Sequence, residues 1–534
     1  MNQSMNWNFP YPSQRMPLLA SNVVATSQPL AAQAGVEMLR KGGNAVDAAL
    51  ATAIALTVVE PNMNGIGSDA FAIVWDGKQL HGLNASGRAP QAWNLERFAR
   101  RDAMPLFGWD AVTVPGAVSA WAALSARFGK LPFMDLFVPA LLYAEKGFPV
   151  SPIVAENWAA QVDKYTDSQD FAKAFLPNGR APRAGEMFKF PEQAYSLSMI
   201  AASKGEAFYR GELAKGIVAH SQSQGGAITL ADLAEHRADW VDPIAQNYHG
   251  HSLHEIPPNC QGIAALMMLG ILAHCDVKRF SLDSADCVHL QLEAMKLAFA
   301  DTYRYVADGS AMEVDVKQML APDYLASRAK LIDPAHAQFP SWGSPRDIPA
   351  GSETVYLTTA DAGGMMVSYI QSNYMGFGAG VIVPGTGISL QNRGSAFSLD
   401  PRHPNCVAPR KRPFHTIIPG FLTANAAPVM SFGVMGGVMQ AQGHAQMVVR
   451  VVDYQQNPQS ACDAPRWYLD PMQQLYFETG FGRNVIEALT RRGHRVADPQ
   501  PMFSYGGAQL IYCMENGVYA AGSDHRKDGH AIGF

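Results

Sequence analysis

The chain has 534 residues, 48% of them hydrophobic and 16% charged, with 41 basic and 46 acidic side chains and a formal charge of -5. This near-neutral balance gives no reason to expect a nucleic acid or an anionic membrane as a partner. The longest apolar runs, such as residues 48–59, are too short to cross a bilayer of about 30 Å. The first residues lack the basic and apolar segments of a secretion signal, which predicts a cytoplasmic protein.

The six cysteines are scattered, with no C-x-x-C pair, so free buried thiols are expected rather than a disulfide framework. The length could hold two or more cores, and we expect one integrated body of two lobes.

In chain order, the predicted elements begin with two alanine-rich helices over residues 30–39 and 45–59, separated by a Gly-Gly-Asn break. Two long helices are predicted further on, over residues 262–273 and 284–305. Residues 248–256 alternate like a strand and carry three histidines. Because these histidines do not all share one face of a strand, we interpret them as scattered strand histidines and not as a metal site.

Residues 354–360 and 365–372 are rich in β-branched and aromatic side chains, which predicts two short strands joined by a turn at residues 361–364. Antiparallel partners keep a constant sum of residue numbers. A hairpin closed about this turn therefore places Thr354 opposite the end of the second strand, at Ser372. Two hydroxyl groups are expected to meet there.

The preceding segment, residues 339–352, has three prolines and two glycines and is the clearest linker in the chain. It ends just before Thr354. A hydrolase needs a nucleophile, a base and donors for an oxyanion, and the sequence has no G-x-S-x-G, H-E-x-x-H or zinc-spaced Cys/His pattern. Cutting the chain before a threonine frees an α-amine, with an ordinary pKa of about 7.7–8.0, that can serve as the base.

Eight segments match one known family in the family's own order. They are GGNAVDAALATAIALTVVEPNMNGIGSDAF (42–71), VPGAVSAWAALSARFGKLPF (114–133), FYRGELA (208–214), IPPNCQGIAAL (256–266), ETVYL (353–357), PGTGISLQNRG (384–394), RKRPFHTIIP (410–419) and NPQSACDAPRW (457–467). Through them the chain resembles the γ-glutamyltransferase family of N-terminal-nucleophile hydrolases over nearly its whole length.

The resemblance implies self-cleavage between Glu353 and Thr354, giving a large chain of residues 1–353 and a small chain of residues 354–534. Together the two chains would form one α+β body, a four-layer αββα sandwich with two central antiparallel sheets. No metal or organic cofactor is implied.

It also implies roles for individual residues. Thr354 would be the nucleophile, supported by the second hydroxyl of Ser372, in agreement with the hairpin argument. The paired glycines that donate backbone N–H groups to the oxyanion fall on Gly436 and Gly437.

The sequence departs from the family in the pocket that holds the glutamyl group. Ser86 stands where the family has an arginine for the substrate carboxylate, although Arg88 follows two residues later. Ala396 replaces an acid that binds the substrate amine, within QNRGSAF where the family reads NNQMDDF. His415-Thr416 replaces a Ser-Ser pair that binds the carboxylate.

These changes remove the counter-charge for an ammonium and keep cationic and donor groups. The pocket is therefore expected to bind an anion through Arg88, Arg393, His415 and Thr416, with Asn373 as a further candidate contact. The alternative is that Arg393 and His415 pair with acidic residues of the fold.

The sequence thus predicts an amidohydrolase for a small carboxylate-bearing amide, with oxamate amidohydrolase as the best candidate within the family. A γ-glutamyltransferase or glutathione hydrolase, a glutaryl-type acylase and an uncut, inactive binding protein are the alternatives. The expected partners are the amide substrate, water and the two chains of one precursor, with no nucleic acid or membrane; a homo-oligomer of the processed heterodimer is left open.

Overall fold

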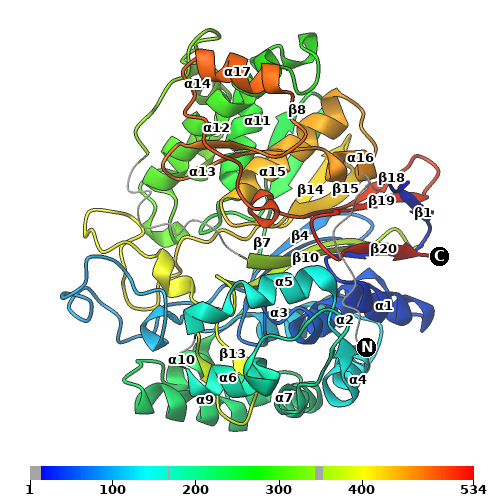
Figure 1. The fold of residues 1–534 in the computed structure, drawn as a ribbon, viewed down its shortest axis with the longest axis vertical. Helices are drawn as coiled ribbons and strands as arrows, with labels where there is room; N and C mark the ends of the chain where they lie inside the picture. Colours follow the sequence, from blue (N-terminus) through cyan, green and yellow to red (C-terminus); the bar gives the residue numbers. More distant parts are fainter. Residues whose placement is uncertain (1–13, 166–167, 343–352) are drawn as a thin grey trace, which may run out of the picture.

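The computed structural model describes residues 14–165, 168–342 and 353–534, and two seven-stranded antiparallel sheets form its centre (Figure 1). The first, called the β10 sheet, has the order β20 (His530–Gly533), β2 (Val23–Thr26), β10 (Glu353–Ala360), β11 (Met366–Tyr374), β3 (Asp69–Trp75), β4 (Leu80–Asn84) and β7 (Asp239–Val241). The second, called the β15 sheet, has the order β1 (Leu18–Ala20), β19 (Tyr519–Ser523), β18 (Ala508–Cys513), β15 (Ala427–Val434), β14 (Gly420–Ala424), β9 (His251–Glu255) and β8 (Ile244–Tyr248).

Helices cover the outer face of each sheet (Figure 1). The helices on the β10 sheet side are α1 (Pro29–Arg40), α2 (Ala45–Val59), α3 (Ala117–Phe128) and α4 (Val138–Lys146). Those on the β15 sheet side are α11 (Gly262–Leu272), α12 (Ala285–Tyr305) and α15 (Met439–Val448). The order of layers is therefore helix, sheet, sheet, helix, and the predicted four-layer αββα fold is confirmed.

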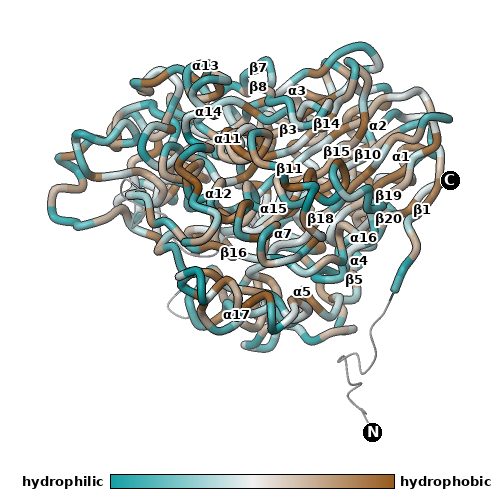
Figure 2. Tube along the Cα trace, turned by 90° about the horizontal axis from the view of Figure 1, so that it is seen from above, coloured by the Kyte–Doolittle hydropathy of each residue, from teal (hydrophilic) through white to brown (hydrophobic). Residues whose placement is uncertain are grey.

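Successive side chains of β10 enter the cores on the two faces of its sheet. Val355 and Leu357 pack into the core under α2, whereas Tyr356 points into the core between the sheets, because successive side chains of a strand face opposite ways. Between the sheets, the hydroxyls of Thr358 and Ser431 lie 2.5 Å apart. Figure 2 shows hydrophobic segments through the middle of the molecule and hydrophilic ones in outer loops.

The helix predictions are confirmed to within a residue or two. For α2 the reason is visible in the cap, since Asn44 accepts the N–H of Asp47 while Asp47 accepts the N–H of Asn44, at 3.0 and 2.9 Å. Every residue of α2 is buried, which its alanine-rich composition allows.

The prediction of one strand over residues 248–256 is wrong. β8 ends at Tyr248 and β9 begins at His251, with His249 and Gly250 in the left-handed region at φ 49° and 86°. Two such residues in succession form a tight hairpin turn. His249, in the turn, contacts Asp453 at 2.7 Å, whereas His251 and His254 both lie on β9, so the histidines are scattered, as expected, but over one strand and a turn.

Two other expectations concern the whole chain. In the described ranges, none of the helices has the length and apolar character needed to cross a membrane. All six cysteines are free thiols, three of them buried and three partly exposed. The predicted linker lies mostly outside the described residues; at its start, Trp342 is buried and donates its indole N–H to the carbonyl of Lys296 at 2.9 Å.

Candidate active site

The predicted hairpin forms as expected. Val355 pairs with Gln371 and Ala360 with Met366, and the register shifts between Glu353 and Val355. At this irregular end, the hydroxyl oxygens of Thr354 and Ser372 lie 3.3 Å apart and both side chains are buried.

The oxygen of Ser372 accepts two further hydrogen bonds. The backbone N–H of Tyr374 donates to it at 2.7 Å, and Nη2 of Arg393 donates at 2.8 Å. Tyr374 has φ 80°, a left-handed conformation that is unusual for a residue with a side chain and turns its N–H back onto Ser372. The second hydroxyl is therefore held by the backbone on one side and by a cation on the other.

Arg393 is fully buried, with its guanidinium 4.4 Å from the centre of the Tyr374 ring. Its Nη1 donates to the hydroxyl of Thr416 at 2.8 Å, and its Nε has no hydrogen-bond partner among the described residues. Burial lowers the pKa of Arg393 to about 10, an effect opposed by nearby Asp69. The side chain is thus charged at neutral pH, and its hydrogen bonds go to two hydroxyls.

Asp69 and His415 form a buried pair near Arg393. Nε2 of His415 lies 3.1 Å from a carboxylate oxygen of Asp69, while its Nδ1 accepts the N–H of Ile417 at 3.4 Å. Burial and the charge of Arg393 hold the pKa of His415 well below its usual range, so the neutral ring donates from Nε2. Burial raises the pKa of Asp69 to about 7.

Asp69 is also held by the backbone. One of its oxygens accepts the N–H groups of Gly87 and Gly116, each at 3.1 Å. At Gly116 the chain passes so close that a Cβ atom would lie 1.5 Å from the carbonyl oxygen of Ala85.

We therefore expect Gly116→Ala to displace this segment and the Asp69 carboxylate with it. The free energy of unfolding should fall by about 3 kcal/mol, the scale of overpacking in a core. Thermal unfolding and an activity assay measure both effects. Gly216→Ala is the control, because its Cβ would meet only Val383, at 3.9 Å, and should leave both unchanged.

Gly436 and Gly437 lie between β15 and α15, with φ 115° and 61°. The Gly437 carbonyl accepts from Nε2 of Gln261 at 2.7 Å, and the same amide nitrogen donates to the carbonyl of Thr416 at 2.5 Å. Gln261 thus ties the glycine loop to the segment that holds Arg393. The turn after the glycines brings Gln440, whose Nε2 lies 3.5 Å from Oγ1 of Thr354.

The predicted site residues other than Arg88 and the two glycines form three sets. Thr354, Ser372, Arg393 and Thr416 are joined by direct hydrogen bonds. His415 contacts Asp69, in agreement with the alternative expectation that it pairs with an acidic residue of the fold. Asn373 accepts from the hydroxyl of Ser68 at 2.8 Å and donates to that of Ser389 at 3.2 Å, so it fastens a neighbouring loop.

Arg88 lies elsewhere. Its half-exposed guanidinium contacts Asp239 and Asp308, each at 3.4 Å. Ser86, which precedes it in the same loop, is buried and donates to Asn84 at 2.7 Å. Arg88 therefore belongs to a partly exposed ion-pair group with these two acids.

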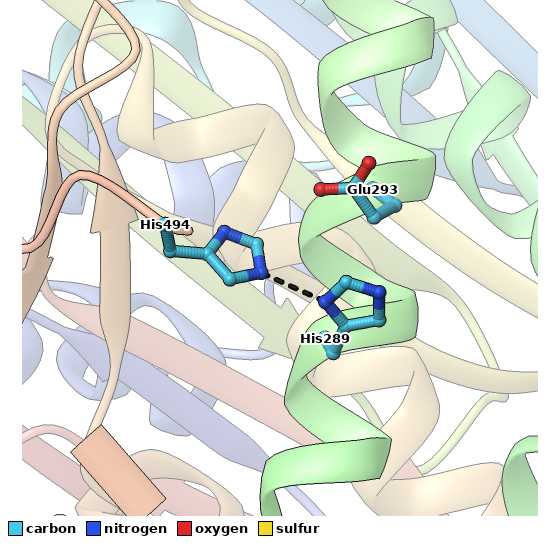
Figure 3. A group of neighbouring side chains, drawn as sticks. All are labelled: His289, Glu293 and His494. Atoms are coloured by element: carbon cyan, nitrogen blue, oxygen red, sulfur yellow. Dashed lines mark hydrogen bonds between the residues drawn. The ribbon is translucent and has the colours of Figure 1, made fainter. Parts of the chain in front are cut away.

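One buried cluster has donor atoms that suit a metal, namely His289, Glu293 and His494, whose ligand atoms lie within 4.8 Å of one another (Figure 3). The two rings contact each other at 2.8 Å. The ammonium of Lys296 donates to Glu293, to the carbonyl of Gln338 and to His494, at 2.8, 2.9 and 3.4 Å. Its three N–H groups match these three acceptors, and a divalent cation would add buried charge beside it. We therefore interpret the cluster as a hydrogen-bonded group.

Sequence reasoning missed four residues of the site: Asp69, Gln261, Tyr374 and Gln440. Asp69 ends a Gly-containing loop, and Gln440 follows the Gly-Gly pair by one turn, so both stand beside recognised segments. Asp69, Gln261 and Gln440 have partners 86 to 346 residues away in the sequence, and the contact of Tyr374 depends on a backbone turn that no local pattern indicates.

Comparison with known proteins places this geometry in a family. A family model described as gamma-glutamyltranspeptidase matches residues 31–534. The chain is 36% identical to the glutathione hydrolase-like YwrD proenzyme of Bacillus subtilis, over 96% of this chain and 98% of that protein. It is also 36% identical to the oxamate amidohydrolase proenzyme of Klebsiella pneumoniae, over 95% of this chain and 97% of the relative.

A crystal structure of a cephalosporin acylase from Bacillus halodurans is similar with a TM-score of 0.94 and 47% identity, covering 100% of this chain and 99% of that one. The chain therefore belongs to the gamma-glutamyltranspeptidase family of N-terminal-nucleophile hydrolases, enzymes that act on amides.

Proposed function

We propose that this enzyme cuts its own chain between Glu353 and Thr354 and then uses Thr354 to hydrolyse a small amide whose acyl part carries a carboxylate. The best candidate substrate is oxamate, which would give oxalate and ammonia. Self-cleavage is supported by the relatives, several of which are named proenzymes, and by the position of Thr354 at the irregular end of β10. The products would be residues 1–353 and 354–534.

In self-cleavage, the Thr354 oxygen attacks the carbonyl carbon of Glu353 and loses its proton. The C–N bond then breaks, the nitrogen takes up a proton, and an ester joins the two parts. Water hydrolyses this ester and leaves a free α-amine on Thr354. Ser372, 3.3 Å from the attacking oxygen, is placed to orient it.

In turnover, the new α-amine accepts the proton of the Thr354 hydroxyl as its oxygen attacks the substrate carbonyl. The N–H groups of Gly436 and Gly437 would hold the oxyanion, a role that suits two successive residues with positive φ before a helix. The C–N bond breaks, ammonia leaves with the returned proton, and water releases the acid from the acyl-enzyme.

The buried guanidinium of Arg393 is the observation that carries the choice of substrate. It is bound to Ser372, which contacts the nucleophile, and its Nε lacks a partner among the described residues. A carboxylate on the acyl group would accept from such a guanidinium and compensate its charge. Thr416, held by the same guanidinium, offers a second polar contact.

A substrate ammonium is disfavoured at the same place. Ala396, which replaces the family's amine-binding acid, is buried one turn after Arg393 and carries no charge. An α-amino group brought close to the guanidinium would meet a like charge in a buried site, at a cost of several kcal/mol.

Steady-state kinetics on the processed enzyme would decide. Ammonia release from oxamate should have a higher kcat/KM than amine release from a γ-glutamyl anilide. Glutaryl anilide is the control, because it matches the glutamyl compound except that it lacks the ammonium. A preference for the γ-glutamyl anilide over both others would overturn the proposal.

A glutaryl-type acylase is the second candidate. The similar crystal structure at 47% identity is of a cephalosporin acylase, and an acylase ACY 1 proenzyme of a Pseudomonas strain is 32% identical over 96% of this chain. A glutaryl group carries a carboxylate and no ammonium, so it also fits Arg393. Higher kcat/KM for glutaryl anilide than for oxamate would select this candidate.

A further inference from the structure

A buried amide, that of Gln440, contacts the hydroxyl oxygen of Thr354 in addition to Ser372. Nε2 of Gln440 lies 3.5 Å from Oγ1 of Thr354, and Gln440 is fully buried. Its Oε1 accepts the backbone N–H of Ile418 at 3.0 Å. Because only the amide oxygen can accept this N–H, the orientation of the amide is fixed, and its N–H groups face Thr354.

Gln440 is also fixed to the glycine loop. It lies in the first turn of α15, and its backbone N–H donates to the carbonyl of Gly437 at 3.1 Å. The same carbonyl accepts from Gln261 at 2.7 Å. The side chain that contacts Thr354 and the backbone proposed to hold the oxyanion therefore belong to one rigid turn.

We propose that Gln440 is a further catalytic residue, which donates an N–H to Oγ1 of Thr354 whenever that oxygen carries developing negative charge. This inference rests on the proposed function of Thr354. The charge develops when Oγ1 loses its proton and attacks, in self-cleavage and in acylation. It develops again when water attacks the acyl-enzyme, the bond from the acyl carbon to Oγ1 breaks, and Oγ1 leaves with the electron pair and regains a proton.

A donor in this position acts on rate more than on substrate binding. Its hydrogen bond to a neutral hydroxyl is long at 3.5 Å and gains strength as the oxygen becomes anionic, so it favours the transition state over the ground state. Loss of one preorganised donor to a developing oxyanion commonly lowers kcat by about 10²–10³-fold. Because the hydroxyl of Ser372 also contacts Oγ1 of Thr354, we expect a smaller fall in kcat when Gln440 is replaced, of roughly 10- to 100-fold.

The test compares Gln440→Met with Gln442→Met. Gln442 lies on the same helix, is equally buried, and bonds to the carbonyls of Val438 and Leu469 and to the N–H of Leu469 at 2.9–3.2 Å. Its replacement should disturb folding at least as much without changing a contact to Thr354. Self-cleavage of the purified precursor is followed by intact mass, and kcat and KM are measured per mole of small chain, with thermal unfolding as the measure of folding.

Gln440→Met should slow self-cleavage and lower kcat by roughly 10- to 100-fold, with KM changed less than about twofold. If that variant does not fold, Gln440→Glu decides, because it keeps an acceptor for Ile418 and replaces the donor by an acceptor; it should be slow in the same way. Equal kcat and cleavage rates in the Gln440 and Gln442 variants would overturn the role of Gln440 and leave Thr354 untouched. A wild-type chain that is never cut, or a Thr354→Ala chain that is active, would instead overturn the proposed function itself.

Discussion

Replacing Thr354 by alanine is expected to leave the whole 534-residue chain uncut and to abolish amide hydrolysis. The change removes the only atom proposed to attack both the Glu353 carbonyl and the substrate, and an uncut chain has no α-amine at this position to act as base. Both self-cleavage and amide hydrolysis should fall below the detection limit. Intact mass under denaturing conditions and an ammonia-release assay measure the two effects.

Thr358→Ala is the matched control, since Thr358 lies on the same strand, is equally buried, and bonds to Ser431 in the other sheet. That variant loses a buried hydroxyl, at a cost of about 1 kcal/mol, and should still be cut and active. Thr354→Ser should also be cut. Normal cleavage of the Thr354→Ala chain would show that another group cuts the precursor.

Arg393→Met is expected to have the second largest effect, a fall in kcat/KM for oxamate of roughly 30-fold or more. Leaving a buried carboxylate without its charged partner costs at least about 2–5 kcal/mol, and each 1.4 kcal/mol is tenfold. Arg450→Met is the control, because Arg450 is also buried and pairs with Asp283 outside the site. Equal kinetics of the two variants would show that Arg393 does not bind the acyl carboxylate.

The same variant should change the pH dependence. The α-amine works as a base only when unprotonated, so activity is lost as the pH falls through its pKa. Ser372 contacts both Thr354 and the guanidinium of Arg393, and we expect the nearby positive charge to favour the neutral amine over the protonated one. Removing that charge should move the acidic limb of the kcat/KM profile to higher pH; an unmoved limb would contradict this coupling.

The sequence predicts the elements whose signals are local. The β10–β11 hairpin follows from two β-rich runs about a Gly-Gly turn, and α2 follows from its Asn44 cap and apolar run. The same kind of reasoning fails at His249, because a histidine in the left-handed region before Gly250 begins a turn that the alternating pattern hides. Placing Thr354 opposite Ser372 needs only the register of one hairpin.

The pocket depends on contacts that no local pattern encodes. Asp69 meets His415 across 346 residues of sequence, and Gln440 reaches Thr354 from helix α15, on the side of the β15 sheet. For Arg88, the position in the sequence was misleading. It follows a position that binds the substrate carboxylate in the family by two residues, which predicted a place in the pocket, but its guanidinium pairs with Asp239 and Asp308. Side-chain direction in such loops is set by partners from distant segments.

In the proposed mechanism, Thr354 becomes the N-terminal residue of the small chain and carries the acyl group during turnover. Acid quenching of the enzyme with oxamate, followed by intact mass and N-terminal sequencing, tests it most directly. We expect two chains, the smaller beginning at Thr354 and bearing the acyl adduct on its first peptide. A single full-length chain that hydrolyses the amide at full rate, or an adduct on another residue, would contradict it.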